Sequence, residues 1–178
     1  VKAVAAKEGR NPKTGETTEI RIQHLLTHSS GLPAYASVEP LRKQHGSPCP
    51  DALLAHISNV RRQFAPATGF RYSCLNFITL QYVIERITGQ SLADYAHANV
   101  FKPLGMSHTV YCPPDEWKPI IAPTERQANG SVLRGVVHDP LARVINGGIS
   151  GNAGLFSSAE DLAVLCAALQ NGGEWNGA

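Results

Sequence analysis

Hydrophobic residues recur every three to four positions in five stretches of the chain, the spacing of one face of an α-helix. These stretches cover residues 22–26, 50–57, 73–88, 91–100 and 158–170. Gly31 and Pro33 follow the first stretch and predict its end. Pro50 opens the second stretch. Proline is tolerated there because the first residue of a helix needs no backbone N–H partner. The pattern predicts five or six short helices.

The three later stretches also carry helix-start signals. Ser73, Ser91 and Ser158 each precede an apolar run, and serine is a favoured N-cap because its hydroxyl oxygen can accept a backbone N–H. The stretch after Ser73 has an apolar stripe that is too broad for one small bundle to cover. It comprises Phe77, Ile78, Leu80, Val83, Ile84 and Ile87. We expect part of this face to be exposed and to promote self-association.

Prolines and glycines interrupt the helical pattern elsewhere. Residues 34–50 hold three prolines and a glycine and are expected to form an irregular loop. Residues 107–150 hold five prolines, and Asn129-Gly130 between short apolar stretches predicts a β-hairpin. Four glycines in residues 147–154 predict an adaptable loop. The predicted fold class is mainly α: one helical domain over residues 1–178, with long loops, a small β-hairpin and an extended or linker segment at residues 1–20.

Composition places the chain among folded globular proteins. Its 178 residues are 43% hydrophobic and 17% charged, which is enough for about one domain with a buried core. The net charge is 16 − 14 = +2 without a block of like charges, so nucleic acid is not an expected partner. The longest apolar runs are a few residues long, and residues 1–10 lack an apolar segment. Neither a membrane span nor a signal peptide is predicted.

Two short strings resemble catalytic motifs but fit their surroundings better as turns. Lys13-Thr14-Gly15 lies in a polar stretch before the first predicted helix. Residues 148–152 (GISGN) depart from the G-x-S-x-G nucleophile motif at the last position, and no strand is predicted before them. We interpret the first string as a turn and the second as a glycine loop.

The histidines and cysteines do not predict a metal site, and no cofactor is expected. His24 and His28 are four residues apart, but the glutamate of H-E-x-x-H and a nearby third ligand are missing. We interpret them as histidines that satisfy carbonyl groups at a helix end. The four cysteines form no Cys-x-x-Cys pair, and Cys166 is predicted to be a buried free thiol on the last helix.

Five ordered sequence blocks are far more specific. They are residues 24–33 (HLLTHSSGLP), 66–74 (PATGFRYSC), 83–91 (VIERITGQS), 101–106 (FKPLGM) and 153–162 (AGLFSSAEDL). In this order the set strongly resembles the serine hydrolases of the β-lactamase and penicillin-binding-protein superfamily. Relatives there include class C β-lactamases, D-Ala-D-Ala carboxypeptidases and β-lactamase-like esterases. The resemblance runs from about Ile20 to Gly173 and implies the helical subdomain of the β-lactamase/DD-peptidase-like fold.

The resemblance implies a mechanism built on three motifs. The serine of S-x-x-K is acylated, Tyr-x-Asn supplies a second acid–base group, and a Lys- or His-x-Gly strand completes the pocket. Tyr72-Ser73-Cys74 matches the second motif, so Tyr72 is the candidate catalytic residue. A tyrosine has an ordinary pKa of about 10, so this role requires cations near the phenolate. The alternative for Tyr72 is an aromatic buried at a helix start. Cys74, Asn152 and Ala153 are the candidate substrate-binding residues.

Departures from the family pattern limit what the chain is expected to do. No lysine follows a serine at the S-x-x-K spacing. The nucleophile is therefore expected before Val1, and the third motif beyond Ala178. Cys74 stands where the family has asparagine, which removes an amide that contacts substrate. We interpret Cys74 as a hydrogen-bonding replacement in the pocket wall rather than as a reactive thiol.

The sequence thus predicts the helical portion of a serine acyl hydrolase that acts on a β-lactam, a D-Ala-D-Ala peptide or an ester. The isolated chain is expected to be inactive. The expected partner is a small-molecule acyl substrate of the parent protein. The resemblance would place that parent protein in the bacterial periplasm or outside the cell. The alternative is a truncated, non-catalytic binding or structural module. A reading frame that continues upstream through S-x-x-K favours the first hypothesis, and a start codon near Val1 favours the second.

Overall fold

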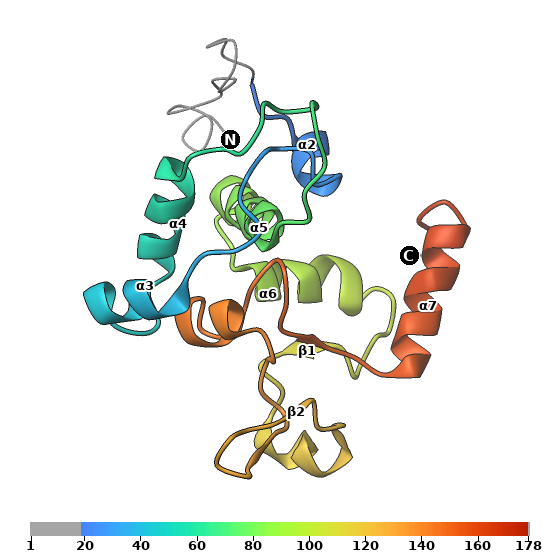
Figure 1. Ribbon diagram of the computed structural model, residues 1–178. Helices are drawn as coiled ribbons and strands as arrows, with labels where there is room; N and C mark the ends of the chain where they lie inside the picture. Colours follow the sequence, from blue (N-terminus) through green and yellow to red (C-terminus); the bar gives the residue numbers. More distant parts are fainter. Residues whose placement is uncertain (1–18, 178) are drawn as a thin grey trace.

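The computed structural model describes residues 19–177, and helices dominate it (Figure 1). The α-helices are α2 (Ile22–Leu26), α3 (Val38–His45), α4 (Pro50–Asn59), α5 (Cys74–Thr88), α6 (Leu92–Ala96) and α7 (Ala159–Gln170). Two π-helical turns, η1 (His97–Phe101) and η3 (Leu141–Ile145), and one 3₁₀ helix, η2 (Asp115–Ile120), lie between them. The prediction of a mainly α fold is confirmed. No helix among the described residues is long and apolar enough to cross a membrane.

Two small antiparallel sheets complete the fold. Strand β1 (Val110–Tyr111) pairs with β4 (Leu155–Phe156), with Val110 opposite Phe156. Strand β2 (Glu125–Arg126) pairs with β3 (Val132–Leu133), and the turn between them contains Asn129-Gly130, as predicted. The β2–β3 hairpin and η2 form a unit set apart from the helices at the bottom of Figure 1.

The three serines that were predicted to begin helices all lie at helix N-termini, but their hydroxyl groups form two kinds of hydrogen bond. The Ser91 and Ser158 side chains accept the backbone N–H groups of Asp94 and Asp161, which is the expected capping bond. The Ser73 hydroxyl instead donates to the Pro33 carbonyl oxygen over 2.6 Å. Ser73 therefore ties the start of α5 to the segment after α2.

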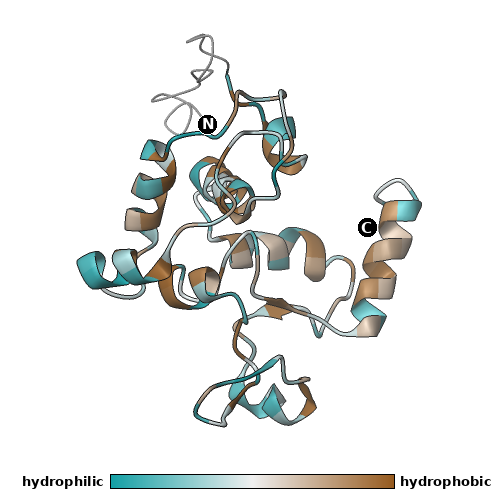
Figure 2. Cartoon of the chain, in the orientation of Figure 1, coloured by the Kyte–Doolittle hydropathy of each residue, from teal (hydrophilic) through white to brown (hydrophobic). Residues whose placement is uncertain are grey.

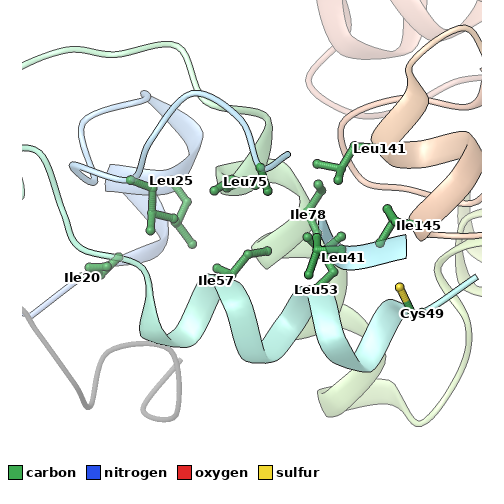
Figure 3. Packing of buried hydrophobic residues seen from close by; sticks show 12 residues of the cluster. Ile20, Leu25, Leu41, Cys49, Leu53, Ile57, Leu75, Ile78, Leu141 and Ile145 are labelled. Carbon is green, nitrogen blue, oxygen red and sulfur yellow. The ribbon is translucent and has the colours of Figure 1, made fainter. Parts of the chain in front are cut away.

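Helix α5 lies at the centre of the molecule, with α2 and α4 packed against it. The core between these helices contains completely buried leucine and isoleucine side chains from each of them (Figure 3). They include Leu25, Leu53, Ile57, Leu75 and Ile78. Each such side chain contributes about 1.5–3 kcal/mol when removed from water, so this core fixes the position of α5.

The expectation of an irregular loop over residues 34–50 is wrong, because α3 forms there. Pro40 lies in the first turn of α3, where backbone N–H groups have no partner within the helix. Leu41 is buried in the core beside η3, and Gly46 ends the helix with a φ of +83°. Proline therefore marks the start of a helix here rather than a break.

The distribution of exposed apolar side chains also differs from the prediction. On α5, Ile78 and Val83 are buried, and only Ile87 of the predicted stripe is strongly exposed, at 77%. Helix α7 carries the larger exposed apolar surface, with Leu162 at 48% and Leu169 at 69% (Figure 2). Cys166 on α7 is exposed, so its predicted burial is wrong. Helical periodicity identified the apolar faces but not which of them are covered.

Candidate functional site

The segment that leads into α5 is held against the residues that follow α2. Three backbone N–H groups of this segment donate to carbonyl oxygens there, each over 2.9 Å. The pairs are Ala67 to Ser29, Arg71 to His28, and Cys74 to Ala34. Two of the sequence blocks, residues 24–33 and 66–74, therefore form one ordered unit, and Tyr72 lies within it.

Tyr72 lies on the surface of this unit, with 61% of its side chain exposed. Its ring packs against the His28 imidazole, with the ring centroids 4.5 Å apart and the planes tilted by 42°. Within residues 19–177 the Tyr72 hydroxyl forms no hydrogen bond. The alternative of a buried aromatic is therefore wrong: the ring is held on one side and the hydroxyl is open to a ligand.

Hydrogen bonds fix the orientation of His28. Its Nδ1 accepts the Ser73 backbone N–H over 3.2 Å and lies 3.1 Å from Nδ2 of the buried Asn76. The Asn76 carbonyl oxygen accepts the Ser30 hydroxyl over 2.5 Å, so its Nδ2 is the donor to His28. Two donors at Nδ1 require that nitrogen to be unprotonated. His28 thus supports the Tyr72 ring in one defined orientation.

These contacts correct the interpretation of the two histidines. The His24 Nδ1 accepts the Arg21 backbone N–H over 3.1 Å, so both imidazoles accept N–H groups rather than satisfying carbonyl groups. Among the described residues, no group of three or more potential ligands could hold a metal ion. Sequence analysis missed the structural roles of Ser30 and Asn76. The signal for Asn76 was an amide on an otherwise apolar face of α5.

Cys74 and Asn152 are brought together by the fold. Burial raises the pKa of the Cys74 thiol above its ordinary value, a hydrogen bond with Asn152 opposes that shift, and the Asp139 carboxylate adds to it. The neutral thiol therefore dominates at neutral pH, and a protonated thiol is a weak nucleophile. Cys74 and Asn152 form a polar contact beside Tyr72, from residues 78 positions apart in the chain.

A hydrogen-bond network fixes Asn152 in turn. The Ser150 hydroxyl donates to the Asn152 Oδ1 over 2.7 Å, and Asn146 Nδ2 donates to Ser150 Oγ over 2.9 Å. The Gln81 Oε1 accepts from Asn146 Nδ2 over 2.9 Å and from the Gly151 backbone N–H over 3.0 Å. The network connects the glycine-rich loop to the middle of α5, so the loop and Cys74 share one rigid support.

Two glycines of this loop allow backbone carbonyl groups to approach them closely. A Cβ atom at Gly151 would overlap the carbonyl oxygen of Phe77 on α5. Gly154 has a φ of +108°, and a Cβ atom there would overlap the Gly148 carbonyl oxygen. Gly151 and Gly154 are therefore required by close backbone contacts.

Ala153 lines a cavity of about 660 Å³ between the loop, β4, η2 and the segments on either side of the β2–β3 hairpin. Most of the lining is apolar, with polar groups at a few positions. The apolar part includes Trp117, Ile120, Ile121, Val136, Val137 and Leu155. The polar part includes His108, His138, Asp139 and Ser157. This size and composition are typical of sites that bind small molecules.

Asp139 connects the cavity electrostatically to the Cys74 region. Its carboxylate lines the cavity and raises the pKa of Cys74. Burial, followed by Asp139, raises the pKa of Tyr35 to about 12, and the Tyr35 hydroxyl oxygen accepts the Leu141 backbone N–H over 2.8 Å. Asp139 and Tyr35 were not identified from the sequence, because nothing local distinguishes them from other loop residues.

Comparison with known proteins gives one family over most of the chain. Residues 8–176 match the family model described as Beta-lactamase. A putative D-alanyl-D-alanine carboxypeptidase of Escherichia coli strain K12 is 36% identical over 171 residues, covering 86% of this chain and 39% of that protein. An N-acetylmuramyl-L-alanine amidase of Bacillus subtilis strain 168 is 31% identical, covering 88% of this chain and 39% of that protein.

A solved structure shows the same fold. The octameric penicillin-binding protein homologue from Pyrococcus abyssi superposes with a TM-score of 0.64 at 23% identity, covering 94% of this chain and 37% of that one. The chain thus spans about two fifths of the length of the relatives it matches. On the extent of these matches, the chain belongs to the beta-lactamase family.

Proposed function

We propose that this chain forms the helical wall of an acyl-hydrolase cleft, in which Tyr72 acts as an acid–base group on a nucleophile from outside the chain. The observation that carries the proposal is Tyr72 itself, an exposed aromatic whose ring is held against His28 while its hydroxyl has no partner among residues 19–177. Burial of the ring would stabilise the fold more, so its fixed exposure favours a role toward a ligand.

The reaction in the parent protein is acyl transfer to a serine, followed by hydrolysis of the acyl-enzyme. In the first step the serine oxygen bonds to the acyl carbon and loses its proton, and the leaving group departs protonated. Tyr72 would carry a proton in this exchange. The chain has no serine at the S-x-x-K spacing, so the isolated polypeptide would not turn over substrate.

The substrate class that fits best is a peptide ending in D-alanine. The naming of the Escherichia coli relative as a putative D-alanyl-D-alanine carboxypeptidase supports this class. Cys74, Asn152 and Ala153 would form the substrate-binding wall, and the cavity that Ala153 lines would accept an apolar part of the acyl group. β-Lactams and esters share the acyl chemistry and are the substrates to compare.

The test is the acylation rate of the longer protein that contains this chain together with an S-x-x-K serine. Tyr72→Phe keeps the ring and its contact with His28 but removes the hydroxyl. We expect acylation to slow by about 10²–10⁴-fold, the usual contribution of an acid–base group, with little change in substrate binding. Burst kinetics separate acylation from KM.

Tyr95→Phe is the matched control, because Tyr95 is half-buried on α6 and belongs to none of the site contacts. It should leave acylation unchanged. An acylation rate for Tyr72→Phe within about threefold of the wild type would show that Tyr72 is a packing residue. Stoichiometric labelling of the isolated 178-residue chain by a penicillin or fluorophosphonate probe would contradict the proposal that the nucleophile lies elsewhere.

A further inference from the structure

A second hollow lies in the connection between α4 and α5. Its volume is about 600 Å³. Two short stretches form it, residues 61–64 and residues 68–71. Phe64 and Gly69 meet within the hollow, since a Cβ atom at Gly69 would contact the Phe64 ring at 3.3 Å. It shares no lining residue with the cavity beside Ala153.

Three arginines line this hollow, and none of its lining residues within 19–177 is acidic. They are Arg61, Arg62 and Arg71. No carboxylate of the described residues forms an ion pair with Arg61 or Arg71. These two side chains are exposed.

The backbone around the hollow is held in place. The Gln63 N–H donates to the Gly31 carbonyl oxygen over 2.8 Å, and the Thr68 hydroxyl donates to the Ala65 carbonyl oxygen over 2.7 Å. The buried Arg62 donates from Nη1 to the Ser30 carbonyl oxygen over 3.0 Å and so forms part of the floor. Arg61 and Arg71 therefore extend from a fixed frame, which lowers the entropic cost of closing them on one ligand.

We propose that this hollow is an oxyanion-binding site, which takes the carboxylate or phosphate group of a small ligand between Arg61 and Arg71. A guanidinium presents a planar fork of N–H donors that matches both groups, and charge-assisted hydrogen bonds are the stronger kind. Phe70, which is 73% exposed at the rim, offers an apolar surface to the rest of the ligand. The site stands on these residues alone and does not depend on catalysis by Tyr72.

The test is a ¹H–¹⁵N NMR titration of the full 178-residue chain with inorganic phosphate and, separately, with succinate. Ionic strength is held at about 0.1 M with chloride, so that general screening stays constant. We expect saturable shifts of the Gly69 and Arg71 amides with at least one anion. The anion whose shifts saturate at the lower concentration shows whether phosphate or carboxylate is the preferred group.

In the variant R61Q/R71Q we expect the binding constant to fall by about tenfold or more, because both charged forks are lost. R86Q is the matched control, since Arg86 is exposed near the end of α5 and does not line the hollow. It should bind like the wild type. R61K/R71K keeps both positive charges and should retain saturable but weaker binding. It therefore distinguishes a loss of the charged groups from misfolding of the neutral variant.

Shifts that do not saturate in the wild type would overturn the proposal. Equal binding by the wild type and R61Q/R71Q, or an equal loss in R86Q, would overturn it as well, because attraction would then reflect overall charge. None of these readouts requires enzymatic activity, so the result is independent of the test of Tyr72.

Discussion

The Ser30 hydroxyl donates a hydrogen bond to the Asn76 carbonyl oxygen over 2.5 Å, although the two residues are 46 positions apart. Both side chains are completely buried, and the Asn76 amide nitrogen continues the chain of contacts to His28 Nδ1. The segment after α2 is thus joined to α5 by polar groups that have no access to water. Tyr72 rests on the last member of this chain, His28.

Asn76→Ala should destabilise the chain by about 2–4 kcal/mol, because it removes a buried side chain, the acceptor of the Ser30 hydroxyl and one of the two donors to His28 Nδ1. Urea denaturation followed by circular dichroism measures the loss. Asn99→Ala is the control, because the exposed Asn99 side chain bonds only to the Tyr95 carbonyl oxygen. A loss no larger than that of the control would show that the buried contacts contribute little.

Tyr72→Phe should leave the free energy of unfolding within about 0.5 kcal/mol of the wild type. The reason is that the ring contact with His28 remains, and the hydroxyl has no partner among the described residues to lose. The same denaturation experiment applies. A large loss of stability would mean that the hydroxyl has a structural role, and a slower acylation could then no longer be assigned to proton transfer.

Cys74 should react with iodoacetamide more slowly than the exposed Cys112 and Cys166. The raised pKa of Cys74 lowers its thiolate fraction at any pH below that pKa, and only the thiolate attacks. Peptide mass spectrometry at several pH values between about 7 and 11 gives the three rates. The Cys74 rate should keep rising at pH values where a thiol of ordinary pKa has levelled off. A Cys74 rate equal to the other two would contradict the assigned shift.

Cys74→Asn should be tolerated, because an amide can replace the thiol in the contact with Asn152. In the longer protein we expect unchanged or higher activity on amide substrates relative to esters. Thermal unfolding and the ratio of kcat/KM for the two substrate types are the measurements. Cys74→Ser serves as a small polar control. A loss of folding in the asparagine variant alone would show that the space at this position does not admit an amide.

Self-association is expected to proceed through α7 rather than α5, because α7 exposes Leu162, Cys166 and Leu169. Light scattering under reducing conditions should show a dimer or larger species at about 100 μM chain. Leu169→Glu should shift it to the monomer, whereas Ile87→Glu at the end of α5 should not. A monomeric wild type at that concentration would contradict the expectation.

Features set by neighbours in sequence could be predicted, and features set by distant contacts could not. Ser91 and Ser158 begin helices because an N-cap needs only a backbone N–H three residues away, and Asn129-Gly130 forms its turn for a similarly local reason. The exposure of Cys166 depends on which elements pack on α7, and no spacing within α7 encodes that.

The same distinction applies to the candidate site. Tyr72, Cys74 and Asn152 could be named as candidates from the sequence, but the groups that hold them could not. The bond from Gly151 to Gln81 spans 70 positions, so neither residue stands out locally. From the sequence, the loop glycines were interpreted as a source of conformational freedom. Gly151 is required for a different reason, because a Cβ atom there would overlap the backbone of α5.

The two walls of the cavity beside Ala153 have different origins. One wall comes from η2 and from the segments on either side of the β2–β3 hairpin, in the unit that lies apart from the helices in Figure 1. The other includes Ala153 and Gly154, which belong to the glycine-rich loop that Gln81 ties to α5. Substitutions in η2 or in residues 136–139 can therefore reshape the cavity while the contact of the Tyr72 ring with His28 stays in place.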